Sequence, residues 1–348
     1  MKLATIAGAV CLCTATAFAD GRPDAHAPIG VMGDHLHDKG EVMFSYRFMQ
    51  MSMEGNRVGS SSISADEIVT TIPNRFTDLP MMPPTLRVVP TEMIMQMHMF
   101  GVMYAPSDRV TLMAMLKVLD KSMDHTTYMG PAGTVVLGNF TTETSGLGDT
   151  RIAALIRWME DDDHRVHATL GVSLPTGSTD ETGNVLTPMN TEPTLRLPYP
   201  MQLGSGTWDL IAGLTYAGNG ERWGWGSQWQ SLIRTGDNDE GYTLGDEHTL
   251  TGWASYLVGP RISLSGRVTY IDRGNIDGID PMIAAPVQTA DPDRQGIERS
   301  DLSVGANLVL PGDRHRLALE FWVPLTERLA GPQLETDWQV TLGWQMAL

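Results

Sequence analysis

Methionine is concentrated in one stretch of the sequence, where it recurs at alternate positions. Sixteen of the 22 methionines lie between residues 32 and 129. Thioether sulfur is a soft ligand that selects Cu(I) or Ag(I) over hard cations, and imidazole nitrogen also suits copper. Alternate spacing places side chains on one face of a β-strand. The pattern therefore predicts strands that carry rows of thioether groups.

These methionines form three groups, at residues 49–53, 93–103 and 113–115. The first and third oppose the apolar faces of their strands and are predicted to point into a lumen, whereas the facing of the second stays open. We predict that this wall, with nearby histidines, passes or holds Cu(I); the alternative is that methionine fills an irregular apolar lumen. The candidate metal ligands are Met49, Met51, Met53, Met93, Met95, Met97, Met99, Met113, Met115, His26, His35 and His37.

Two further sets of polar residues are candidates for metal binding and for solute selectivity. His26, His35 and His37 could form a periplasmic metal-binding arm, or simply a polar tail without a ligand. Charged residues on the predicted lumen face could set selectivity, although opposed charges inside barrels more often pair to hold the wall together, which we favour. This charged set is Asp149, Arg151, Arg157, Arg267 and Glu320.

The elements that carry these residues are predicted to be β-strands. Most alternate apolar and polar residues with a period of two, as Val166–Leu174 and Asp301–Leu310 do. The twelve candidate strands are residues 41–53, 91–104, 110–120, 147–159, 166–174, 207–216, 225–234, 248–258, 261–270, 301–310, 316–323 and 337–348.

The connections between these segments alternate in length. Compact turns rich in Gly, Pro, Asn and Asp, such as residues 218–222 and 311–314, alternate with long polar connections such as 54–90 and 175–206. We therefore predict an all-β fold: a closed antiparallel transmembrane β-barrel of about 12 strands, with short periplasmic turns and long extracellular loops.

The N-terminus reads as a secretory signal. Lys2 precedes an apolar stretch that ends in Ala17-Phe18-Ala19, which predicts Sec-type export and cleavage near Ala19-Asp20. Both cysteines, Cys11 and Cys13, lie in this segment, which excludes disulfides and thiolate sites from the mature chain. We predict a signal peptide at 1–19, a periplasmic segment at 20–39 and the barrel at 40–348.

Composition narrows the choice of partner. No run of 18 apolar residues follows the signal, and the mean hydropathy of −0.13 is typical of a barrel whose strands average apolar and polar faces. The net charge of −17 argues against nucleic acid as a partner.

Short motifs carry a resemblance to a known family. They are Gly146-Leu147-Gly148-Asp149-Thr150-Arg151, Leu174-Pro175-Thr176-Gly177 and Trp208-Asp209-Leu210. The chain thereby resembles the outer-membrane family described as "putative MetA-pathway of phenol degradation", and the runs at 26–35 and 97–106 resemble a Met-rich branch of it. The resemblance implies a barrel with a transporter-like role.

The sequence thus predicts a bacterial outer-membrane channel for a small solute, hydrophobic, aromatic or copper-related. The alternatives are a non-conducting barrel, plugged by residues 20–39, that binds or senses Cu(I), and a structural barrel without transport. The expected partners are outer-membrane lipid, the barrel-assembly machinery and a small-molecule or metal solute. We expect no enzymatic activity, because no His-x-Ser pair occurs, and no cofactor other than Cu(I).

Overall fold

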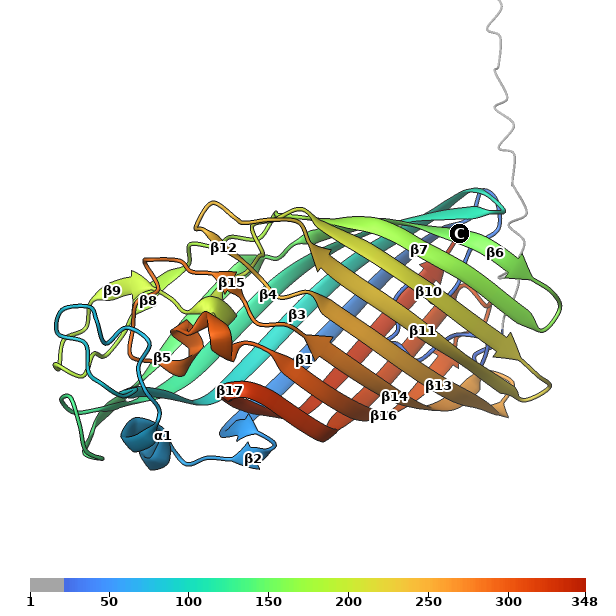
Figure 1. Cartoon of the computed structure of the whole chain (residues 1–348). Coiled ribbons are helices and arrows are strands. Elements are labelled where there is room, and N and C mark those ends of the chain that lie inside the picture. The colour runs from blue at the N-terminus through green and yellow to red at the C-terminus, as the bar shows by residue number, and fades with distance from the viewer. Residues whose placement is uncertain (1–21) are drawn as a thin grey trace, which may run out of the picture.

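The chain folds into a closed β-barrel (Figure 1). The structure is a computed structural model that describes residues 22–348; the predicted signal peptide and its cleavage site lie outside these residues. A 13-stranded antiparallel sheet closes on itself because its last strand pairs with its first. Closure leaves no free edge in the ring, so each strand pairs its backbone with neighbours on both sides.

Eleven of these strands form the ring, and two further strands pair with members of it: the two-residue β2 (Ser61–Ser62) with β1, and β5 (Val136–Leu147) with the part of β4 beyond its pairing with β6. The ring strands are β1 (Val42–Gly59), β3 (Val88–Ser107), β4 (Val110–Tyr128), β6 (Thr150–Glu160), β7 (His164–Leu174), β10 (Asp209–Asn219), β11 (Trp223–Arg234), β13 (Glu247–Gly259), β14 (Ile262–Arg273), β16 (Ile297–Val309) and β17 (His315–Ala347).

Strand β17 is 33 residues long and differs from the others. Its first part pairs with β16 up to Leu329, and its second part pairs with β1 from Leu329 onward. The two parts lie side by side, since the N–H of Ala347 donates to the carbonyl of Arg314 at 3.1 Å and Trp344 stacks on His315. The prediction of a long connection at 324–336 is therefore wrong, because strand pairing continues through it.

The barrel wall is apolar outside and polar inside. In β16, Leu302 and Val304 are 41% and 60% exposed, whereas Ser303 between them is buried. Outward apolar residues alternate with inward residues along the other ring strands too, because successive side chains point to opposite faces, but on β1, β3 and β4 many inward residues are methionines. This distribution is the reverse of that in a water-soluble protein, which buries its apolar residues and exposes its polar ones.

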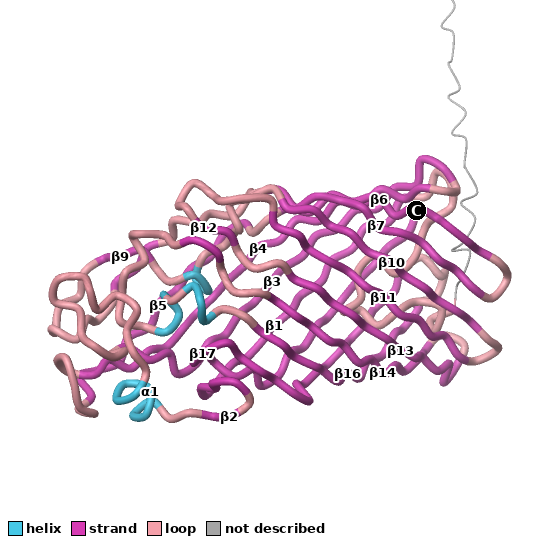
Figure 2. Tube along the Cα trace, viewed as in Figure 1, coloured by secondary structure: helices cyan, strands magenta, loops and turns pink. Residues whose placement is uncertain are grey.

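The two ends of the barrel differ in their connections. Five short turns, at 108–109, 161–163, 220–222, 260–261 and 310–314, lie at one end, on the right in Figure 1. The opposite end carries the long connections, which appear as the crowded loops on the left of Figure 2. They run over 60–87, 129–149, 175–208, 235–246 and 274–296.

Several long connections are shorter than predicted because strands on the methionine-rich side rise further. β1, β3 and β4 have 18, 20 and 19 residues, and residues 136–145, predicted as loop, belong to β5, which pairs with β4. The connections hold one helix, α1 (Ala65–Thr71), three 3₁₀ turns and two small sheets. Within residues 22–348, no helix is long and apolar enough to cross a membrane.

Candidate functional site

Residues 22–41 form a plug inside the barrel at the short-turn end. Side chains from five ring strands hydrogen-bond to its backbone, so it is held across the lumen. The bonds are Ser263 Oγ to Pro23 O at 2.8 Å, Arg316 Nη2 to Ala27 O at 2.5 Å, Gln228 Nε2 to Met32 O at 2.9 Å, His167 Nε2 to Gly33 O at 2.9 Å, and Thr111 Oγ1 from His37 N at 3.0 Å. The described part of the segment at 20–39, predicted to be periplasmic, therefore lies inside the lumen.

The plug fits closely where it meets the wall. Ile29 is 2% exposed and occupies the space that a side chain at Gly343 would need. The N–H of Gly30 donates to Glu320 Oε2 at 3.3 Å, and Glu320 also forms a buried ion pair with Arg267. A Cβ atom at Gly30 would lie 2.5 Å from Arg267 Nη2, so only glycine fits here without a shift. Arg267 and Glu320 thus pair with each other and hold the plug.

A polar cluster lies at the centre of the plug. Asp34 Oδ1 lies 2.9 Å from His35 Nδ1, and Asp34 Oδ2 accepts the N–H of Ala27 at 3.0 Å. The rings of His26 and His35 meet edge to face with their centroids 5.0 Å apart. One ligand atom each from His26, Asp34 and His35 lies within 4.8 Å of the others, and all three residues are buried.

His37 extends this cluster. Its ring lies against that of His35 at a centroid distance of 4.9 Å, and its Nδ1 lies 3.3 Å from Glu41 Oε2. Atoms Nε2 of His35 and of His37 are buried and hydrogen-bond to no group in the described chain. The histidines expected on a free arm are therefore enclosed by the barrel.

Burial controls the protonation of the plug. Burial lowers the pKa of His26 well below its ordinary value of 6.5, and burial together with the nearby His35 lowers the pKa of His37 to about 3. Burial alone would raise the pKa of Asp34, but its contact with His35 holds that pKa well below the ordinary value. At neutral pH, His26 and His37 are neutral and Asp34 is a carboxylate.

The predicted methionine wall lines the lumen on three adjacent strands. Strand register pairs Met49, Met51 and Met53 of β1 with Met97, Met95 and Met93 of β3. Paired residues share a face, and Phe100, Val102 and Tyr104 of β3 are exposed on the opposite, outer face, so the open question about β3 is answered. Met99, Met103, Met113 and Met115 point the same way, as do Met43 and Met123, which lie outside the three predicted groups.

A chamber of about 410 Å³ lies between the plug and the long connections. Met51, Met53, Met93, Met95 and Met123 form its thioether side. Charged residues face the same chamber: Lys117, Lys121, Asp149, Arg151, Arg234, Glu247, Arg273, Arg299 and Glu327. Seven of these charges come from other strands and connections, whereas Lys117 and Lys121 lie on β4 beside the thioether groups.

The predicted lumen charges occupy different places. Asp149 and Arg151 line the chamber, and Asp149 accepts the N–H groups of Gly177 and Ser205 at 3.2 and 2.9 Å. Arg157 lies instead at the short-turn end, where it pairs with Glu160. Asp149, Arg157, Arg267 and Glu320 are thus held by the wall or the connections, whereas a simple charged ring would need them free in the lumen.

One segment of the 175–208 connection closes the chamber from the long-connection side. It includes the 3₁₀ turn η1 (Tyr199–Met201), and Met201 packs with Leu197 against Met93 and Met123. Lys121 Nζ donates to the carbonyls of Pro200 and Gln202 at 2.7 and 2.5 Å. This partition separates the chamber from a second cavity.

The second cavity, which we call the mouth cavity, has a volume of about 590 Å³ and lies among the long connections. Its lining comes from five stretches of chain far apart in sequence, which is why sequence periodicity did not reveal it. His125 lies in its wall, stacked on Phe140, far from the plug histidines. The lining is mainly apolar and includes Met82, Val88, Phe140, Leu195, Leu197, Ala285 and Val287.

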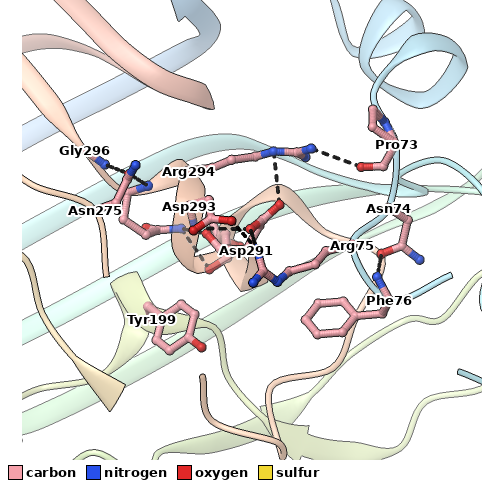
Figure 3. A network of polar contacts seen from close by, with 12 residues as sticks. Pro73, Asn74, Arg75, Phe76, Tyr199, Asn275, Asp291, Asp293, Arg294 and Gly296 are labelled. Carbon is pink, nitrogen blue, oxygen red and sulfur yellow. Dashed lines mark hydrogen bonds and ion pairs between the residues drawn. The ribbon is translucent and has the colours of Figure 1, made fainter. Parts of the chain in front are cut away.

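Contacts between connections make this end a folded cap. Arg75 Nη1 lies 3.2 Å from Asp291 Oδ1 and also pairs with Asp293, while Arg294 donates to the carbonyl of Pro73 at 3.1 Å (Figure 3). These bonds tie connection 60–87 to connection 274–296. A small apolar core packs beneath them, formed by Phe76, Val88, Tyr199, Tyr242, Ile276, Ile283, Val287 and Ala290.

Comparison with known proteins identifies the family of this chain. Residues 110–283, half of the chain, match the family described as "Putative MetA-pathway of phenol degradation". The chain belongs to this family. No curated protein matches it significantly, and the Met-rich branch stays a prediction.

Solved structures share the fold. An outer membrane channel from Pseudomonas putida F1 aligns over 91% of this chain and 98% of its own, with 14% sequence identity and a TM-score of 0.58. The toluene transporter TodX of Pseudomonas putida aligns over 89% and 90% of the two chains, with 10% identity and a TM-score of 0.45. The first likeness shows a common barrel fold.

Proposed function

We propose that this protein is a bacterial outer-membrane channel for small, uncharged apolar solutes, described here with its lumen closed. The inverted surface supports the location, since an apolar outer wall is stable against lipid. Counting the two halves of β17 separately gives twelve traverses. Strands of 11 to 13 residues tilted by about 45° span about 25–30 Å, which matches a bilayer core.

The asymmetric ends support an orientation with the short turns in the periplasm. Both ends of the ring meet there, since the N–H of Leu348 donates to the carbonyl of Val42 at 2.8 Å. The plug enters from the same end, as expected for a chain exported across the inner membrane and inserted by the barrel-assembly machinery into outer-membrane lipid. The long connections and the mouth cavity would then face the outside of the cell.

The mouth cavity is the observation that carries the proposal. Its volume is typical of small-molecule sites, and its apolar lining offers little to a charged or strongly hydrated solute. Burying an apolar solute there gains about 25 cal/mol for each Å² removed from water. A cavity formed by folded connections at the outer end is suited to capture such a solute before it enters the lumen.

The remaining path requires two movements. The partition at Leu197–Leu203 separates the mouth cavity from the chamber, whose thioether side offers a second apolar surface. The plug then closes the periplasmic end. The partition and the plug are both loop segments held to the wall by hydrogen bonds, which makes each a candidate gate.

Filling the mouth cavity tests the proposal. We would express the chain in an outer-membrane-bearing strain that lacks other channels for apolar solutes, and measure the initial uptake of naphthalene. Ala285→Trp adds bulk inside the cavity and is expected to lower uptake to the level of the empty vector. Ala132→Trp is the matched control, because Ala132 is exposed and outside the cavity lining. Equal uptake by the two variants would contradict the role of the cavity.

A second candidate is a closed barrel that holds Cu(I) without conducting. The enclosed histidines and the methionine wall favour it. Planar-bilayer recording separates the candidates: conducting episodes support a channel, and a silent membrane with retained metal supports a binder. A structural barrel would show neither. No catalytic step is assigned.

A further inference from the structure

The histidines of the plug have the contacts expected of residues that bind a metal ion. Asp34 and Glu41 each approach one Nδ1 atom, of His35 and of His37. A carboxylate in this position fixes the imidazole tautomer, because it accepts a hydrogen bond from Nδ1–H, which keeps the proton on Nδ1 and leaves the Nε2 lone pair available. Both Nε2 atoms are buried without a hydrogen-bond partner in the described chain, an arrangement that costs free energy unless something binds there.

We propose that His26, His35 and His37 bind one soft monovalent metal ion, Cu(I), with Asp34 orienting His35. The rings of His26 and His37 contact the His35 ring on two sides, at 5.0 and 4.9 Å between centroids. Both oxygens of Asp34 are already engaged, by His35 and by the N–H of Ala27, so the carboxylate acts through His35 and is a positioning residue.

The surroundings favour a soft monovalent ion over a divalent one. A void of about 20 Å³ beside Asp34 is lined by the thioether residues Met43, Met103, Met113 and Met115. Leu36, between the two histidines, packs against this methionine cluster. Thioether groups beside an imidazole site favour Cu(I) or Ag(I) over a hard cation.

Nearby cationic groups point the same way. Arg47 lines the same void, and Arg316 donates to the carbonyl of Ala27 beside His26. Each guanidinium repels a metal ion bound nearby. At equal distance this repulsion is about twice as large for a divalent as for a monovalent ion.

Ion binding would also hold the plug in its folded form. His26 and His35 lie at opposite ends of the segment that carries Ile29 and Gly30, so one ion would join the two ends. This locking effect rests on the proposed channel function, whereas ion binding does not. A ligand that binds only the folded plug stabilises it by mass action.

The test is a Cu(I) titration of the refolded full chain against a colorimetric Cu(I) chelator, repeated with Ag(I) and with Zn(II). The wild type is expected to bind one Cu(I) or Ag(I) more tightly than Zn(II). Asp34→Asn is expected to weaken Cu(I) binding by about 10- to 100-fold. The double variant His35→Gln, His37→Gln should weaken it further. Heat-modifiable gel mobility checks that each variant still forms a barrel.

Two controls separate this site from other copper ligands. His98→Gln alters a histidine that contacts Tyr46 on the outer face and should leave binding unchanged. The triple variant Met95→Leu, Met97→Leu, Met99→Leu removes thioethers of the lumen wall outside the plug and should leave the one tight ion in place; loss of that ion would overturn the proposal. The proposal is overturned if folded wild-type protein binds no Cu(I), if it prefers Zn(II), or if the plug double variant binds as tightly as the wild type. None of these outcomes depends on solute transport.

Discussion

Acidification should release the plug, because the folded plug holds neutral histidines in a buried site. The pKa of His37 is about 3 in the plug and 6.5 when the segment is exposed. Below about pH 6.5 the released segment therefore binds a proton that the seated plug excludes. The stabilisation is fully present above that pH and is lost as the pH falls toward 3.

The magnitude follows from these two values. At about pH 5, protonation of His37 in the released state favours release by about 2 kcal/mol, a factor of about 30. The buried His26 shifts in the same direction and adds to the effect. His35, Asp34 and Glu41 are the titratable groups that face His37, and the site excludes solvent around it.

Planar-bilayer conductance measures the release. Open probability should rise about 30-fold or more between about pH 7.5 and about pH 5. His37→Leu should remove the part of this pH-dependent rise that is due to His37. His98→Leu, on the outer face, should keep the full rise in open probability. A wild-type open probability that does not change with pH, or a His37→Leu variant with the full wild-type response, would refute the reasoning.

Three further substitutions test the packing. Gly30→Val should unseat the plug and make conducting episodes more frequent at neutral pH, because its Cβ would lie 2.5 Å from Arg267 Nη2; Gly259→Val, with no atom within 4 Å of its Cβ position, is the control in the same recording. Glu320→Gln leaves the Arg267 charge buried and unpaired, so the free energy of unfolding in urea should fall by about 3–5 kcal/mol. Gly204→Val would overlap the facing backbone and displace the partition, which protease cleavage near residue 200 should detect as faster cutting than in the wild type.

The barrel wall was predictable because lipid imposes a strict alternation on each strand. Leu302, Ser303 and Val304 already show in sequence which side chains face outward. The facing of Met93–Met103 was not predictable, since Phe100 and Val102 on the other face are apolar too. Strand pairing resolves it, because Met95 lies opposite Met51 and neighbours across strands share a face.

The closures of the lumen depend on contacts between residues far apart in the chain. In the sequence, Ile29 is an ordinary apolar residue. Its position in the lumen follows only from its packing against Gly343, more than 300 residues later in the chain. The mouth cavity has the same character, since Leu197 and Val287 reach it from separate connections. Neither feature has a periodic signature that local sequence could reveal.

The central claim is that the chain admits small apolar solutes through the outer membrane. Its most direct test is the initial uptake of naphthalene and of a sugar of similar size, compared in the same cells with and without the protein. The account predicts faster entry of naphthalene and unchanged entry of the sugar. Unchanged naphthalene uptake, or equal acceleration of both solutes, would contradict it.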